Sequence, residues 1–490
     1  MNHSTNVSRR RFMHSSVAAP AFLKTVGHRR PNILLITCDQ LRNDALSCTG
    51  NPSARTPNLA CLAREGVYFE NAFATSALCV PSRTSLNTGL YPHRHGILQQ
   101  NNGQPGANCS DLSSSIVSML REQDYRTGLI GRNGFATGQE VLKYFDHVQV
   151  RNRESYRYYP EHVPAWWHGD HYWPTERCYS ALNTDDAIKF IGQGTPGRPF
   201  FLSLNYHDPH PPYMAPSEYV QQFDPHDMRI PDFVPAGALC DDLDQYMRGM
   251  QYHLMTESDL RETMRYYHAQ VLWIDALIGN IIDSLNRLGM TEDTLICLTA
   301  DHGDFLGEHW MTRKGMFFYD ALLRVPLLWY GPGMVQPFGC IDQPASLVDI
   351  LPTLADLLRL SAPTELSGQS LQPHLSESLP ADPDHAVYSF GSYGPYRKTS
   401  PYILEGGPIP EEFSGVALHT RIMQGTKEMQ ARMASVRTLR WRYNRTEGQP
   451  DELYHYEDEW QERKNLINHP EAQEQRRALS RRLDEVWPWL

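Results

Sequence analysis

Short apolar runs alternate with longer stretches of helical periodicity from residue 32 onward. Apolar runs bounded by polar turns are typical of buried strands, and strands that alternate with helices predict a parallel sheet with helices on both faces. The pattern therefore predicts an α/β fold with a mostly parallel central sheet. We expect its buried parallel strands at residues 32–37, 125–130, 200–205, 294–299 and 325–329.

Two helices can be placed from their boundaries and spacing. Thr56 and Pro57 supply an N-cap and a proline at the first helical position, which predicts a helix that closes at Gly66. The longest periodic stretch runs from Leu260 to Leu288, with apolar residues three and four positions apart. This spacing indicates a helix with one face in the core. A coiled-coil partner is the alternative, but a strand follows at once.

A change in composition suggests a boundary late in the chain. Residues 360–384 are rich in Ser, Pro, Leu and Gly without a clear period. We therefore expect a catalytic domain over residues 31–375 and a C-terminal subdomain over residues 376–490. In the subdomain we expect a small antiparallel sheet packed by a helix, with strands at 386–390 and 434–443 and a charged helix at 471–486.

The first 30 residues carry basic side chains and no Asp or Glu. Ser-Arg-Arg-Arg-Phe-Met at residues 8–13 resembles a twin-arginine export signal, and Ala-Pro-Ala at residues 19–21 is a candidate cleavage site. The alternative is a disordered basic tail. The resemblance implies export to the periplasm or the cell exterior.

Composition narrows the function classes. The chain has 490 residues and a net charge of −11, which argues against a nucleic-acid binder that depends on phosphate contacts. It contains no run of about 18 apolar residues, the length that a membrane-spanning helix requires. Its nine cysteines show neither disulfide-framework nor zinc-knuckle spacing. Cys38 and Cys297 lie in apolar strand runs, so we expect them to be buried thiols.

Polar residues follow several predicted strands directly. Asp39 and Gln40 come after the first strand, residues 207–210 follow a later one, and Asp301 and His302 follow another. The carboxyl ends of parallel strands meet at one edge of a sheet, where sites form in open α/β folds. The sequence therefore predicts a site at this edge.

Residues 79–89, Cys-Val-Pro-Ser-Arg-Thr-Ser-Leu-Asn-Thr-Gly, place a thiol immediately ahead of a proline-started helix. An anion at Cys79 would meet free backbone N–H groups and the positive end of the helix. One interpretation is a low-pKa cysteine nucleophile with Arg83 as an anion clamp. The other is an N-capping loop with a buried thiol, and the local features do not choose between them.

The fuller pattern, Cys-x-Pro-Ser-Arg followed by Leu-x-Thr-Gly, resembles the signature of type I sulfatases in the alkaline phosphatase superfamily. In that family a maturation enzyme oxidises the cysteine to formylglycine. The resemblance implies the family's sheet sandwiched by helices, and it runs from about residue 31 to the end of the chain. It also rests on Asp39-Gln40 and on residues 56–59, 91–96, 299–303, 324–326, 451–454 and 465–466.

The resemblance implies hydrolysis of sulfate monoesters. One hydroxyl of the hydrated aldehyde attacks sulfur, the alcohol leaves, and the second hydroxyl is deprotonated to release sulfate. A divalent cation would assist, with Ca²⁺ as our first choice and Mg²⁺ or Mn²⁺ as alternatives. Many relatives carry a second carboxylate in place of Gln40 and Asn in place of His302. The implied metal ligands are Asp39, Gln40, Cys79, Asp301 and His302.

Other residues align with the family's groups that contact sulfate. Lys314 would bind a sulfate oxygen as a point charge. His302 would either be a metal ligand or donate a hydrogen bond to sulfate. His210 would protonate the leaving alkoxide, and it also falls in the substrate-binding set. Arg83 would hold the formylglycine hydrate. Arg132 stands where the family has lysine and would serve as a bidentate clamp on the substrate.

The segment around Arg132 lacks the family's histidine two places later. Alternatively the loop is rearranged, and His93, His95 or another group takes over proton transfer. The sequence does not choose among them.

Aromatic residues between positions 156 and 179 suit stacking on sugar rings, with a packed aromatic core as the alternative. We therefore expect a sulfated carbohydrate as substrate. Alternatives are a phosphonate or phosphate ester hydrolase of the same superfamily and a choline-sulfatase-like enzyme for small molecules. A two-zinc phosphatase fits less well, because its chemistry wants a Ser or Thr nucleophile. A sulfated-glycan binding module is disfavoured by the complete metal set, and the oligomeric state stays open.

Overall fold

The structure is a computed structural model that describes residues 30–99, 112–134, 141–151, 166–170, 175–194, 196–232, 247, 250–393, 431–456 and 462–488. Residues 31–490 form one compact unit. The predicted export signal lies outside the described residues except for Arg30, and most of the aromatic segment 156–179 does too. None of the described helices has the length and hydropathy that a membrane span requires.

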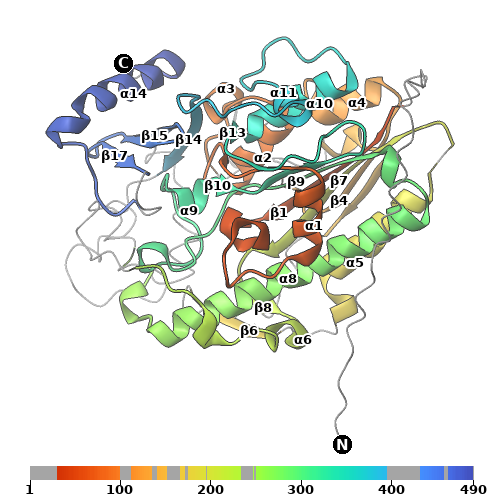
Figure 1. Ribbon diagram of the computed structural model, residues 1–490, viewed down its shortest axis with the longest axis horizontal. Helices are drawn as coiled ribbons and strands as arrows, with labels where there is room; N and C mark the ends of the chain where they lie inside the picture. The colour runs from red at the N-terminus through yellow and green to blue at the C-terminus, as the bar shows by residue number, and fades with distance from the viewer. Residues whose placement is uncertain are drawn as a thin grey trace, which may run out of the picture. The chain divides into compact units, whose positions relative to one another are not determined.

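An eight-stranded mixed sheet forms the centre of the unit (Figure 1). β1 pairs in parallel with β7 and β9, and β4 pairs in parallel with β7 and β5. The parallel strands predicted at residues 32–37, 125–130, 200–205 and 294–299 are therefore confirmed as β1, β4, β7 and β9. In spatial order the strands are β12 (Gly339–Ile341), β2 (Val67–Phe69), β11 (Leu327–Tyr330), β9 (Thr294–Ala300), β1 (Asn32–Asp39), β7 (Phe200–Pro209), β4 (Arg126–Gly131) and β5 (His147–Val150).

The strand expected at residues 325–329 has the opposite direction from the prediction. β11 pairs antiparallel with β9. A parallel neighbour needs a crossover across one face of the sheet, usually a helix of several turns. Between β9 and β11 the chain forms loops, a short 3₁₀ turn, the one-turn helix α9 (Asp320–Leu323) and the two-residue strand β10 (Arg324–Val325), none of which crosses the sheet, so the chain returns along β9 in reverse. The prediction of a parallel strand is wrong here for that reason.

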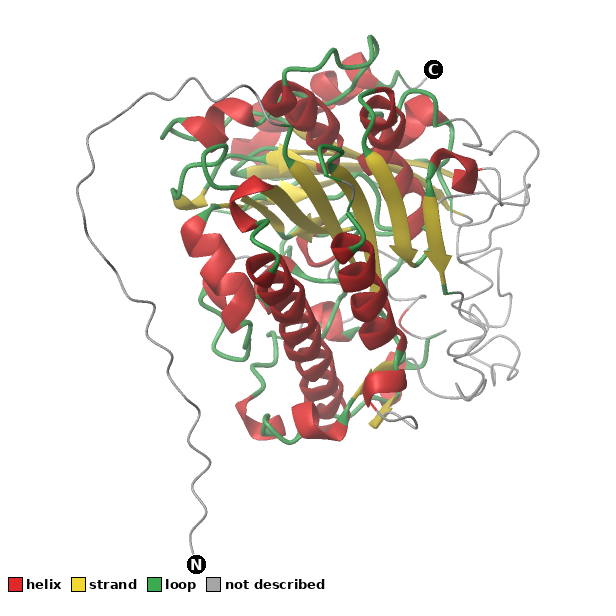
Figure 2. Ribbon diagram, turned by 90° about the vertical axis from the view of Figure 1, so that its right-hand side faces the viewer, coloured by secondary structure: helices red, strands yellow, loops and turns green. Residues whose placement is uncertain are grey.

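Helices cover both faces of the sheet (Figure 2). The long periodic stretch forms α8 (Glu257–Arg287), with its apolar positions buried as expected. α8 packs with α1 and α5 on one face, while α2 and α10 pack together on the other (Figure 1). The helices of these layers are α1 (Pro57–Glu65), α2 (Cys79–Thr88), α3 (Pro92–His95), α4 (Ile116–Glu122), α5 (Tyr179–Gly192), α6 (Ser217–Val220), α10 (Ile350–Leu358) and α11 (Gln372–Ser376).

The start of α1 is capped differently from the prediction. The helix begins at Pro57, but the Thr56 hydroxyl accepts from the backbone N–H of Ser47 at 2.8 Å and caps nothing in α1. Asp275 of α8 accepts from the N–H of Leu59 at 2.8 Å instead. A long-range carboxylate therefore replaces the local cap and ties the two helices together.

The C-terminal region forms a four-stranded antiparallel sheet with α14 (Gln473–Val486) packed on it, as expected. The single strand expected at 434–443 is wrong, because the chain reverses after Thr438. The N–H of Thr438 donates to the carbonyl oxygen of Trp441 at 2.9 Å, and the Thr438 hydroxyl accepts from the N–H of Trp441 at 3.2 Å. Two strands of a hairpin result. The sheet contains β14 (Val387–Tyr393), β15 (Ala431–Arg437), β16 (Trp441–Thr446) and β17 (Glu452–His455). Smaller sheets join β10 (Arg324–Val325), β3 (Ala72–Phe73) and β13 (Ala345–Ser346), and β6 (His168–Asp170) with β8 (Tyr213–Ala215).

Candidate active site

The predicted polar residues meet at the carboxyl edge of the central strands. Asp39 is the last residue of β1, and Asp301 follows β9 directly. Pro209, the last residue of β7, is the register partner of Asp39. His210 therefore follows β7 directly, next to the end of β1. Three strands therefore deliver these side chains to one edge, because parallel strands share their carboxyl ends.

Four side chains converge there, and we call them the site cluster: Asp39, Cys79, Asp301 and His302. Their potential ligand atoms all lie within 4.8 Å of one another, and all four residues are buried. Cys79 Sγ lies 3.2 Å from His302 Nε2 and 3.6 Å from Asp39 Oδ1. His302 Nε2 is 3.8 Å from Asp301 Oδ1. The four groups thus enclose one point between them.

Arg83 donates to one oxygen of each carboxylate in the site cluster and leaves the other oxygen to face Cys79 and His302. Its Nε donates to Asp301 Oδ2 at 2.7 Å, and its Nη2 donates to Asp39 Oδ2 at 3.2 Å. Arg83 lies one turn after Cys79 on α2, which places it on the same helix face. A Cβ at Gly134 would lie 1.9 Å from Arg83 Cδ, so only glycine leaves room for this side chain. The Oδ1 atoms consequently face Cys79 and His302.

Two further cations approach the site cluster. Lys314 is buried, and its Nζ lies 3.1 Å from Cys79 Sγ and 3.2 Å from Gln40 Oε1. Arg132 forms an ion pair with Asp39. Gln40 has a left-handed backbone with φ of 66°, which turns its N–H onto Asp301 Oδ1 at 3.0 Å. The structure therefore brings together the residues predicted for metal and sulfate contacts other than His210, namely Asp39, Gln40, Cys79, Asp301, His302, Lys314 and Arg132.

Burial and neighbouring charges set the protonation of the site cluster. Burial raises the pKa of the Cys79 thiol, although Lys314 and Arg83 act to lower it, so the low-pKa cysteine interpretation is not supported. Burial lowers the pKa of His302 to about 3, which leaves a neutral imidazole able to bind a cation. Burial would raise the pKa of Asp301, but the positive charges of Arg83, Arg132 and Lys314 outweigh burial and lower that pKa.

The histidines considered for proton transfer have different surroundings. The His210 ring stacks on His207 at a centroid distance of 4.6 Å, and its Nδ1 lies 2.6 Å from the carbonyl oxygen of Pro211. His95 Nε2 lies 3.0 Å from the Ser85 hydroxyl of α2. His93 packs against aromatic rings of the C-terminal region, 4.2 Å from Phe390 and 5.6 Å from Trp487 between centroids.

The sequence interpretation missed several residues that hold the site. Asp304 accepts from Gln40 Nε2 at 2.5 Å and from the Tyr213 hydroxyl at 2.9 Å. Asn205 accepts from Arg83 Nη1 at 3.1 Å. Asp304 and Asn205 could have been suspected, because the first follows Asp-His-Gly and the second lies in β7 near the site edge. Tyr213 gave no sequence signal.

Part of the predicted aromatic segment is described. Trp166 is buried, and its ring centroid lies 6.0 Å from that of Tyr252, so this residue belongs to the packed aromatic core. Tyr156, Tyr158, Tyr159, Tyr172 and Trp173 lie outside the described residues, and sugar stacking by them stays a prediction.

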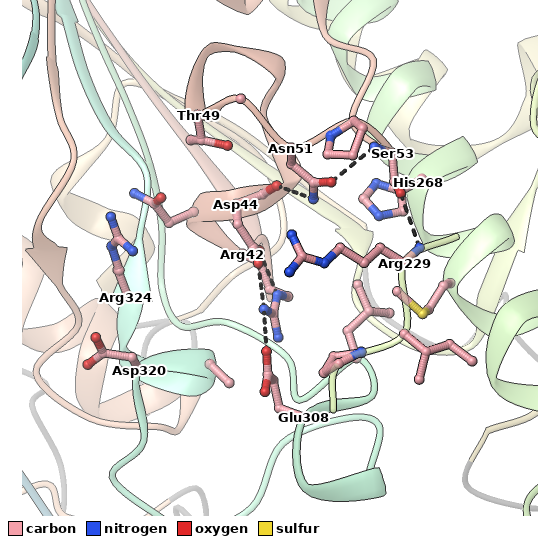
Figure 3. Close-up of a pocket in the computed structure, with 18 of the residues that line it drawn as sticks. Arg42, Asp44, Thr49, Asn51, Ser53, Arg229, His268, Glu308, Asp320 and Arg324 are labelled. Atoms are coloured by element: carbon pink, nitrogen blue, oxygen red, sulfur yellow. Dashed lines mark hydrogen bonds and ion pairs between the residues drawn. The ribbon is translucent and has the colours of Figure 1, made fainter. Parts of the chain in front are cut away.

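A polar cavity of about 340 Å³ lies around Arg42, and none of the site-cluster residues lines it (Figure 3). Arg42 lies between Asp44 and Glu308 in this view. Its Nη2 is 2.6 Å from Asp44 Oδ2, and its Nη1 donates to the carbonyl oxygens of Asp304 and Phe305 at 2.8 Å each. The wall of the cavity thus fixes the loop that carries Asp304.

Comparisons with known proteins agree with this geometry. The family model described as Sulfatase matches residues 31–360. The chain is 27% identical over 413 residues to an arylsulfatase of Clostridium perfringens, which covers 74% of this chain and 82% of the relative. It is 28% identical over 435 residues to iduronate 2-sulfatase of Mus musculus, at 72% and 75% coverage. The structure of a phosphonate monoester hydrolase of Agrobacterium radiobacter matches with a TM-score of 0.72 and 25% identity, covering 93% of this chain and 95% of the other.

Proposed function

Because the chain belongs to the sulfatase family, whose relatives are sulfate ester hydrolases, we propose that it cleaves sulfate monoesters through a formylglycine made from Cys79. The observation that carries the proposal is the site cluster itself. Cys79 begins α2 with its side chain among two carboxylates and a neutral imidazole, all within 4.8 Å. The β-carbon of Cys79, which carries the thiol, would become the aldehyde carbon when the sulfur is replaced by oxygen.

The donor set fits one divalent cation, and Ca²⁺ is the ion we propose. Asp39 and Asp301 direct Oδ1 toward the same point, and carboxylate and amide oxygens are the ligands that Ca²⁺ prefers. When bound, the cation would orient a substrate oxygen and raise the acidity of the aldehyde hydrate. Lys314 would supply further positive charge to the anionic substrate, and Arg83 would hold the aldehyde hydrate. The cation would be held by Asp39, Gln40, Asp301, His302 and the modified Cys79.

The remaining residues divide the charge that develops on the ester. Lys314, beside Cys79, would stabilise the sulfuryl oxygens, and Arg132 would add a second cation on the side of Asp39. His210 would protonate the departing alkoxide, since it directly follows the end of β7, where Pro209 pairs with Asp39. A His210→Ala variant should then lose more activity on sugar sulfates than on aryl sulfates, which depart without protonation. Equal losses at every leaving-group pKa would remove that role.

A sulfated carbohydrate is the substrate class that we propose. One relative is named for iduronate 2-sulfate hydrolysis, and the aromatic segment 156–179 suits sugar rings. Phosphonate monoester hydrolysis is the second candidate, supported by the structural match at a TM-score of 0.72. The arginine-rich segment at residues 8–13 supports export from the cytoplasm.

The test uses the chain produced together with a formylglycine-generating enzyme. Peptide mass spectrometry should find the aldehyde at Cys79, and an unmodified thiol in fully active enzyme would refute the nucleophile. Elemental analysis should find one Ca²⁺ per chain, lost in Asp301→Ala, whereas two zinc ions would favour phosphatase chemistry. A panel of sulfated sugars, choline sulfate, aryl sulfates and phosphonate monoesters then separates the candidates by kcat/KM.

A further inference from the structure

The side-chain amide of Gln40 lies between two groups of opposite charge. Its Nε2 donates to Asp304 Oδ2 at 2.5 Å, and its Oε1 accepts from Lys314 Nζ at 3.2 Å. An ionised carboxylate only accepts hydrogen bonds and an ammonium only donates them. The two neighbours therefore leave one orientation of the amide, with its oxygen on the side of Lys314 and Cys79.

Asp304 is itself held in place by donors. Its Oδ1 accepts from the N–H of Leu306 at 2.8 Å, and its Oδ2 accepts from the Tyr213 hydroxyl at 2.9 Å. The Tyr213 oxygen accepts from the N–H of Arg313 at 2.7 Å, so the hydroxyl proton is free to point at Asp304. Asp304 has no exposed surface. Every donor around this carboxylate thus favours its role as an acceptor toward Gln40.

We propose that Asp304 is a positioning residue that turns the oxygen of the Gln40 amide, and not its nitrogen, toward the cation of the site cluster. The inference rests on the proposed function, because it needs a cation there. Only the amide oxygen is a ligand for Ca²⁺, so an inverted amide would remove one ligand. Partners behind the ligands tune metal sites in this way and typically change affinity by about 10-fold to 100-fold.

The same arrangement explains why position 40 is an amide in this chain. A carboxylate at position 40 would stand about as close to Asp304 as the amide nitrogen does, at 2.5 Å. Two buried carboxylates that close repel each other, and one of them would have to take up a proton. Gln40 and Asp304 therefore act as a matched pair with one negative charge.

The test measures Ca²⁺ binding to the metal-stripped, matured enzyme by calorimetry. Asp304→Asn keeps the shape of the side chain, and its one oxygen can still accept from the N–H of Leu306. Its NH₂ group then takes the place of Oδ2, where it cannot accept from Gln40 Nε2 or from the Tyr213 hydroxyl, so it favours the inverted amide of Gln40. We expect its affinity for Ca²⁺ to fall about 10-fold to 100-fold. Tyr213→Phe removes a donor to Asp304 and leaves the amide paired, so we expect a change below about 3-fold. Circular dichroism checks that each variant is folded.

A second substitution separates positioning from mere structural support. Gln40→Glu alone should weaken Ca²⁺ binding, because it places two carboxylates together. Gln40→Glu combined with Asp304→Asn exchanges the acid and the amide, and we expect its affinity to return to within about 3-fold of the unmodified pair. A structural role for Asp304 would not be rescued by a change at position 40.

The outcomes distinguish the two proposals. If the unmodified pair binds Ca²⁺ and Asp304→Asn binds it equally well, or if Gln40→Glu fails to rescue Asp304→Asn, the positioning role is overturned and the proposed cation stands. If matured enzyme hydrolyses sulfate esters without any bound cation, the proposed cation and the positioning role both fail.

Discussion

In the part of the chain that the structure describes, the site cluster can be compared with another buried group of carboxylates and arginines that uses its oxygens differently. The second one, which we call the Asp320 cluster, consists of Asp320, Arg437, Arg442 and Glu462. Both oxygens of Asp320 accept from arginine, with Arg442 on Oδ1 and Arg437 Nη2 on Oδ2 at 3.1 Å. Both oxygens of Glu462 accept from the N–H of Asp320 at 3.0 Å. Every carboxylate oxygen in the Asp320 cluster therefore has a donor from the protein.

In the site cluster the arginine serves one oxygen of each carboxylate. Arg83 takes Asp301 Oδ2 and Asp39 Oδ2, and the Oδ1 atoms turn toward Cys79 and His302. Asp301 Oδ1 receives backbone N–H groups only. Buried charges normally find full sets of partners. The direction of the remaining acceptors, and not the number of charges, therefore distinguishes the site cluster from the structural ion-pair network around Asp320.

The largest expected effect tests the chemistry of the site cluster. Cys79→Ala keeps the β-carbon but removes the sulfur that the proposed oxidation replaces, so no aldehyde can form, and loss of a nucleophile costs on the order of 10⁶-fold in kcat. We expect turnover to vanish while the circular dichroism spectrum and the unfolding midpoint stay close to those of the parent chain. Activity above about one per cent of the parent would place the nucleophile elsewhere.

The Asp320 cluster should respond in stability instead of chemistry. Arg442 is buried, so Arg442→Met leaves carboxylates without their partner, and we expect a loss of about 3–5 kcal/mol in the free energy of unfolding. Urea unfolding followed by circular dichroism measures this loss, and kcat/KM per folded molecule should stay within about 2-fold.

A matched control lies on the same strand. Arg445 pairs with Asp484, whose side chain is 49% exposed, so Arg445→Met should cost less than about 1 kcal/mol. Equal losses for the two arginine variants would show that the Asp320 cluster contributes no more than a surface pair.

Lys314 tests the ligand-facing side of the site cluster at a smaller scale. Lys314→Ala removes a buried ammonium beside Cys79, and we expect kcat/KM to fall about 10²-fold for every sulfate ester, as for loss of one oxyanion donor. Lys189→Ala, on the exposed face of α5, serves as the control and should change nothing. A loss confined to one leaving group would instead assign Lys314 to the alcohol.

The smallest effect is a pH dependence of the Asp320 cluster. Burial and the charge of Asp320 raise the pKa of Glu462 to about 8, so the folded chain holds a proton that the unfolded chain releases above about pH 4.5. Stability therefore falls as the pH rises toward 8, by at most about 1.4 kcal/mol per pH unit. Glu462→Gln does not titrate and should lack this decline in urea unfolding at pH 5.5, 6.5 and 7.5. Parallel profiles for the two chains would contradict the shift.

The central sheet and the site edge could be predicted because their signals are local. An apolar run followed by Asp39, or by Asp301, states both the strand and the point where it ends. The direction of β11 could not be predicted, because it depends on the path of the chain between β9 and β11. The hairpin at Thr438 was missed since no Gly, Pro, Asn or Asp marks its turn. The role of Asp304 was missed because it depends on contacts with residues far away in sequence.

The position of α2 has a consequence for the timing of biosynthesis. All ten residues of α2 are buried, and Cys79 has no exposed surface. An enzyme that oxidises this side chain would have to bind the segment around Cys79, and the folded protein keeps that segment buried. Under the proposed function, oxidation of Cys79 would have to be completed while the chain is still unfolded, and it would compete in rate with collapse of the core. The fraction of active molecules would be fixed by that race, and a chain that folds faster would be oxidised less completely.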